Sequence, residues 1–143
     1  MMNKMSNILV VMIPFFWVGA VSAISFMEAW LKFRAPGMTL AIGLAVGGVV
    51  FSALNKVEWG CAGLLFTSML MQRCTLLQYI LFSILLLILF TQTFFLFPIL
   101  IHRIAIVQQG GALPPSSIHI VYILLEFIKA GFLIALGILP IRK

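Results

Sequence analysis

Polar residues that could carry acid–base chemistry recur at helical spacing in this 143-residue chain. In the last apolar run, four of them follow one another at steps of three, four and three residues: His119, Tyr122, Glu126 and Lys129. At about 100° per residue these positions fall within an arc of roughly 80° on one helix face. Imidazole and carboxylate groups can transfer protons near neutral pH. The candidate catalytic residues are therefore His102, His119 and Glu126.

Two further runs carry polar residues at the same kind of spacing. One set is Ser25, Glu28 and Lys32; the other is Gly48, Ser52, Asn55 and Trp59. Lysine and arginine bind carboxylates or phosphates, whereas Glu and Asn side chains can hold an amine. The candidate ligand-binding residues are therefore Glu28, Lys32, Arg34, Asn55, Glu58, Trp59, Arg103, Tyr122 and Lys129.

The segments that must position these groups are strongly apolar. Hydrophobic residues make up 64% of the chain and charged residues 8%, and the mean hydropathy is +1.24. A soluble domain is about a quarter charged, so this composition excludes a soluble globular protein. It also excludes a disordered chain. The net charge of +6 comes from Lys and Arg scattered singly, which favours anchoring at a lipid bilayer over binding nucleic acid.

The cysteines and the N-terminal run carry no processing or metal signal. Cys61 and Cys74 lie 13 residues apart, or about 20 Å along a helix, which is too far for a disulfide. No Cys/His spacing is typical of a metal site, so none is expected. The uncharged run 8–27 is longer than a signal-peptide core and is interpreted as a retained first span.

The hydropathy pattern predicts an all-α integral membrane protein, a bundle of four transmembrane helices in one polytopic domain. The expected helices are about 8–31, 39–72, 74–102 and 118–141. The stretch 38–71 would be roughly 51 Å long as one helix, so a break at 55–59 and five spans is the alternative. Four spans are favoured because 59–71 is too short to cross a bilayer. The distribution of Lys and Arg does not indicate how the chain is oriented in the membrane, and it does not identify the membrane.

With four spans, all three carboxylates and both histidines fall on one membrane side. A charge inside a bilayer is costly, so the two deepest groups, Glu126 and Lys129, should face the bundle and be paired. Lys32, Lys56 or Arg103 are the expected cross-helix partners of Glu126. The glycines Gly43, Gly47 and Gly48 predict close helix packing, within the chain or between subunits.

The pair Asn55 and Glu58, followed by Trp59, resembles the second helix of the membrane-associated proteins in eicosanoid and glutathione metabolism. The basic segment 32–34 followed by Pro36 is similar to the exit of that family's first helix. The likeness covers about residues 20–70, and the arginines that the family carries just before the Asn have no counterpart here. The resemblance implies a four-helix fold, commonly a trimer. It also implies that glutathione or another small thiol is bound near one membrane face for transfer to a lipophilic substrate.

The expected function is therefore a polar, charged pocket at one membrane face that binds, and as an enzyme would modify, a lipophilic or amphipathic ligand in a homo-oligomer. The alternatives are a transporter or channel subunit, whose path Glu28, Gln92, Glu126 and Lys129 would line, and a non-catalytic accessory subunit of a membrane complex. The sequence names neither the substrate nor the oligomeric state.

Overall fold

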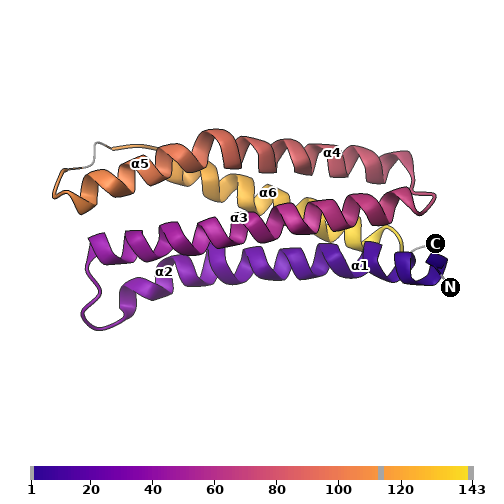
Figure 1. The fold of residues 1–143 in the computed structure, drawn as a ribbon, viewed down its shortest axis with the longest axis horizontal. Coiled ribbons are helices and arrows are strands. Elements are labelled where there is room, and N and C mark those ends of the chain that lie inside the picture. Colours follow the sequence, from indigo (N-terminus) through magenta and orange to yellow (C-terminus); the bar gives the residue numbers. More distant parts are fainter. Residues whose placement is uncertain (1, 113–114, 142–143) are drawn as a thin grey trace.

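A computed structural model describes residues 2–112 and 115–141, with side chains from residue 5 onward, and every regular element in these ranges is helical (Figure 1). Four helices are long and apolar enough to cross a membrane: Met5–Arg34, Leu40–Leu70, Leu76–Gln108 and Ile118–Ile138. The prediction of an all-α bundle is confirmed, and its four long helices have the length and apolar composition that a membrane span needs. The N- and C-terminal ends lie together at one end of the bundle (Figure 1).

The first and third helices each contain a π-helical segment. The first comprises α1 (Met2–Val21), the π-helix η1 (Ser22–Glu28), α2 (Ala29–Leu31) and the 3₁₀-helix η2 (Lys32–Arg34). The third comprises α4 (Leu76–Thr91), the π-helix η3 (Gln92–Leu96) and α5 (Phe97–Gln108). The first helix therefore continues three residues beyond its predicted end at 31. It stops at Ala35, Pro36 and Gly37, where Gly37 adopts a φ of 78° that only glycine takes up easily.

The second helix, α3 (Leu40–Leu70), is continuous through residues 55–59, where a break was the alternative. It begins at Thr39, whose hydroxyl accepts a hydrogen bond from the Ile42 amide. Helix α4 begins with a capping box in which Thr75 and Gln78 bond each other's backbone amides. The last helix, α6, spans Ile118–Ile138.

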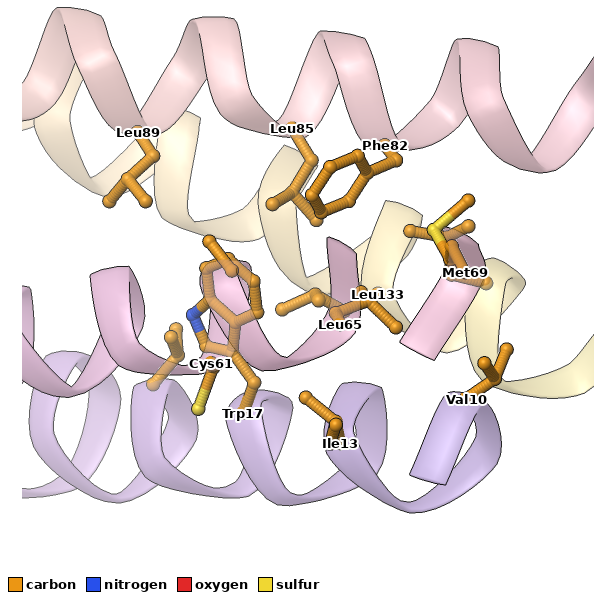
Figure 2. Packing of buried hydrophobic residues seen from close by; sticks show 13 residues of the cluster. Val10, Ile13, Trp17, Cys61, Leu65, Met69, Phe82, Leu85, Leu89 and Leu133 are labelled. Carbon is orange, nitrogen blue, oxygen red and sulfur yellow. The ribbon is translucent and has the colours of Figure 1, made fainter. Parts of the chain in front are cut away.

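The apolar core lies between the four helices in the half of the bundle that holds the termini. Helix α1 packs against α3 and α6, and α4 packs against α6. Figure 2 shows side chains of all four helices meeting there, among them Val10, Trp17, Leu65, Phe82 and Leu133. Many large apolar side chains instead face outward, for example Leu76 and Val49. An outer surface of this kind suits lipid and not water.

The glycines of α3 allow η2 to pack closely against it. A Cβ atom at Gly43 would overlap the ring of Phe33, and one at Gly47 would lie 2.5 Å from Lys32 Nζ. The contact predicted from these glycines is therefore made within the chain.

Candidate functional site

Six buried polar side chains from all four spanning helices meet near the middle of the bundle. They are Trp17, Ser25, Glu58, Gln92, Glu126 and Lys129, and none is more than 5% exposed. We call this set the buried ion cluster. Since these groups are buried, each needs a partner within the protein.

Lys129 lies at the centre of the cluster. Its Nζ donates to Glu126 Oε1 at 2.7 Å and to Gln92 Oε1 at 2.8 Å, and it forms an ion pair with Glu58 Oε1. The Gln92 amide links the same groups a second time, because its Nε2 donates to Glu126 Oε1 at 2.7 Å. The expected pairing of Glu126 with Lys129 is confirmed, and Glu58 on α3 is the cross-helix member.

The two carboxylates differ in how well they are satisfied. Both oxygens of Glu126 accept hydrogen bonds, since Ser25 Oγ donates to Oε2 at 3.0 Å. Glu58 Oε1 accepts from Trp17 Nε1 at 2.9 Å in addition to its ion pair. Glu58 Oε2 is buried and has no hydrogen-bond partner among the described residues. Lys32, Lys56 and Arg103 were the expected cross-helix partners of Glu126, but Ser25 and Gln92 take that role.

Both π-helical segments supply a member of the cluster. Ser25 lies within η1, and Gln92 is the first residue of η3. Each segment closes with an i→i+5 bond, from Ala29 N–H to Ile24 O and from Phe97 N–H to Gln92 O. One extra residue per turn changes the direction of the side chains along the helix, and such turns are frequent at functional sites.

A cavity of about 250 Å³ lies between the cluster and the end of the bundle opposite the termini. Its basic lining residues are Lys32, Arg103 and His119, and most of the remaining wall is apolar. Ser25 and Tyr122 also line it, and Ser25 bonds Glu126 directly. We call this the cation-lined cavity; it adjoins the buried ion cluster.

The predicted residues of helix one lie at or near this cavity. Lys32 Nζ pairs with Glu28 Oε2 at 3.3 Å, the intrahelical pair at i and i+4. The Lys32 ammonium also lies 5.5 Å from the centre of the Phe33 ring and 5.9 Å from that of Phe51. Arg34 is exposed, and its guanidinium covers the Trp30 ring at 4.2 Å, outside the cavity lining.

Asn55 and Trp59 form a separate contact. Asn55 Nδ2 and Trp59 Nε1 both donate to Thr93 Oγ1, at 2.8 and 3.1 Å. Glu58 instead turns into the bundle, so the structure does not bring the three residues behind the family resemblance to one point. His102 is exposed and is not part of the cavity lining, whereas His119 is part of it.

A second cavity, of about 920 Å³, opens at the end that holds the termini. Its polar lining includes Asn7, Gln72, Arg73 and Gln78. Sequence reasoning missed both this cavity and the role of Trp17. An indole N–H in an apolar helix needs an acceptor, which is the signal that could have pointed to Trp17.

No three His, Cys, Asp or Glu side chains of the described residues are grouped to hold a metal ion. Comparisons with family models, with curated proteins and with solved structures gave no match to this chain.

Proposed function

We propose that this chain is a multi-pass integral membrane protein whose cation-lined cavity binds an amphipathic anion. The carboxylate or phosphate head of the ligand would lie against Lys32, Arg103 and His119, and its tail along the apolar wall. The observation that carries the proposal is the meeting of these three basic side chains, from three different helices, around one mostly apolar cavity.

The chemistry of the lining favours an anion. Lysine and arginine form charge-assisted hydrogen bonds to carboxylates and phosphates, and the low dielectric of an apolar cavity strengthens them. The volume of about 250 Å³ holds a head group and the first part of a chain, so the rest of a lipid tail would extend between the helices into the bilayer. His119 would lie beside the head group, where its imidazole would be placed to donate or accept a proton.

The resemblance to the glutathione-using family would involve this cavity only through its basic side chains, because Asn55, Glu58 and Trp59 are not among its lining residues. Glutathione is an anion, and its carboxylates would contact the same basic side chains. A trimer, the common state of that family, would bury part of the apolar outer surface. Glutathione binding and trimer formation are both proposals that depend on ligand binding in the cation-lined cavity.

Transport is the second candidate, and one arrangement favours it. The two cavities lie at opposite ends of the bundle, and the buried ion cluster lies between them. Charged groups held inside a membrane bundle commonly mark a path for ions or substrates. In this case the anion would cross from one cavity to the other.

Binding of a fluorescent fatty acid to the protein in nanodiscs tests the primary proposal. Removing one charged donor should cost about 1.5–3 kcal/mol, so Lys32→Gln should weaken binding by roughly tenfold or more. Lys56→Gln is the matched control, because Lys56 is exposed on α3. Equal affinity of the wild type for the fatty acid and its uncharged methyl ester would overturn the proposal. Flux of the anion into proteoliposomes would support the transport candidate.

A further inference from the structure

The buried ion cluster contains one more acidic group than basic groups. Its ionisable members are two carboxyl groups, Glu58 and Glu126, and one ammonium, Lys129. With all three ionised the cluster would carry a net charge of −1, and all three residues are 0% exposed. An uncompensated charge is unfavourable in a bundle surrounded by lipid. One additional positive charge would make the cluster neutral.

The hydrogen bonds indicate which carboxyl group is the ionised partner of Lys129. Glu126 accepts from three donors, namely Lys129, Gln92 and Ser25, and both of its oxygens are used. This is the environment that favours a carboxylate. Glu58 uses only Oε1, and its buried Oε2 has no partner among the described residues. Glu58 is therefore the carboxyl group at which the additional positive charge is needed.

The groups that face Glu58 favour a proton over a metal ion. Nitrogen donors approach it from α1 and α6, and its other neighbours are a carboxyl group, a phenol and a thiol. Trp17 and Lys129 contact it directly, Cys61, Tyr122 and Glu126 interact with it electrostatically, and Gln92 is hydrogen-bonded to Glu126 and Lys129. Hard metal cations need several oxygen ligands, whereas a proton needs only one lone pair of Oε2.

We propose that the Glu58 carboxyl group is a proton-binding site inside the bundle, with the proton carried on Oε2 and Glu126 serving as the ionised partner of Lys129. Binding forms the Oε2–H bond and leaves Oε1 as a carbonyl oxygen that accepts from Trp17 and Lys129. Loss of the proton returns the cluster to a charge of −1. Because Ser25 links Glu126 to the cation-lined cavity, proton occupancy and an anion in that cavity would influence each other. The proton site itself does not depend on the proposed ligand.

Infrared spectroscopy of the full chain in nanodiscs tests the proposal. A protonated carboxyl group buried in the protein gives a C=O stretching band that moves in deuterated water. We expect this band at neutral pH in the wild type and its loss in Glu58→Gln. Glu28→Gln is the control, since Glu28 pairs with Lys32 outside the cluster, and it should keep the band.

Two conservative variants then distinguish the two carboxyl groups. Trp17→Phe removes a donor to Glu58 Oε1, so it should shift the C=O band to higher frequency. Ser25→Ala removes a donor to Glu126 and should leave the band in place. Absence of the band from the folded wild type would overturn the proposal. A band that responds to Ser25→Ala and not to Trp17→Phe would place the proton on Glu126 and would equally overturn it. A cooperative thermal unfolding transition in both variants establishes that each of them is folded.

Discussion

Replacement of Lys129 by methionine is the most direct perturbation of the buried ion cluster. Methionine keeps the length of the side chain but removes the ammonium, which contacts Glu58, Glu126 and Gln92. Breaking a fully buried ion pair costs about 3–5 kcal/mol. Because a domain of this size is stable by only about 5–15 kcal/mol, Lys129→Met should remove a large share of the free energy of unfolding.

Equilibrium unfolding in mixed detergent micelles, followed by tryptophan fluorescence, measures this loss. Lys56→Met is the matched control, because Lys56 is exposed, and it should change stability by less than about 0.5 kcal/mol. The triple variant Glu58→Gln, Glu126→Gln and Lys129→Met contains no buried charge and should regain most of the loss. If Lys129→Met unfolds at the same detergent composition as the wild type, the reasoning that the buried Lys129 ammonium stabilises the fold is wrong.

Two further predictions concern packing and topology. Gly43→Ala should destabilise the protein by about 1–3 kcal/mol, since its Cβ would overlap an aromatic ring. Gly60→Ala is the control, because a Cβ there meets open space, and it should stabilise α3 by about 0.5–1 kcal/mol. Thermal unfolding compares the two variants, and equal shifts in melting temperature would contradict the close packing at Gly43. Single cysteines at Lys32 and Arg103 should react with an impermeant thiol reagent from one membrane side and a cysteine at Arg73 from the other. Labelling of positions 73 and 32 from the same side would contradict the topology.

Much of the fold could be predicted because the bilayer imposes simple requirements on a sequence. Runs of about 20 apolar residues identify spanning helices, and Pro36 with Gly37 identifies the first turn. The two π-helical segments could not be predicted in this way. Ser25 and Gln92 within these segments contact Glu126 and Lys129 inside the bundle, and no periodic pattern in the sequence indicates those contacts.

The candidate site could be predicted in part. The requirement that a buried charge be paired led to Glu126 and Lys129, and both lie in the cluster. The polar step pattern of helix two grouped Asn55 with Trp59 and left the direction of Glu58 open. Asn55 and Trp59 do share a face, where both contact Thr93.

The direction of Glu58 follows from the apolar residues around it. Leu54 lies four residues before Glu58, and Cys61 and Leu65 lie three and seven residues after it, and all three are buried, so the carboxyl group lies within the buried stripe of α3. A single carboxyl group in such a stripe must meet a donor from another helix. Leaving it unpaired would destabilise the fold by about 3–5 kcal/mol, as does breaking a buried ion pair. Lys129 is a completely buried cation among the described residues, and its ion pair with Glu58 links α6 to α3 across the bundle. The same ion pair therefore fixes the rotation of α3 and places the one oxygen, Oε2, on which the proton proposal depends.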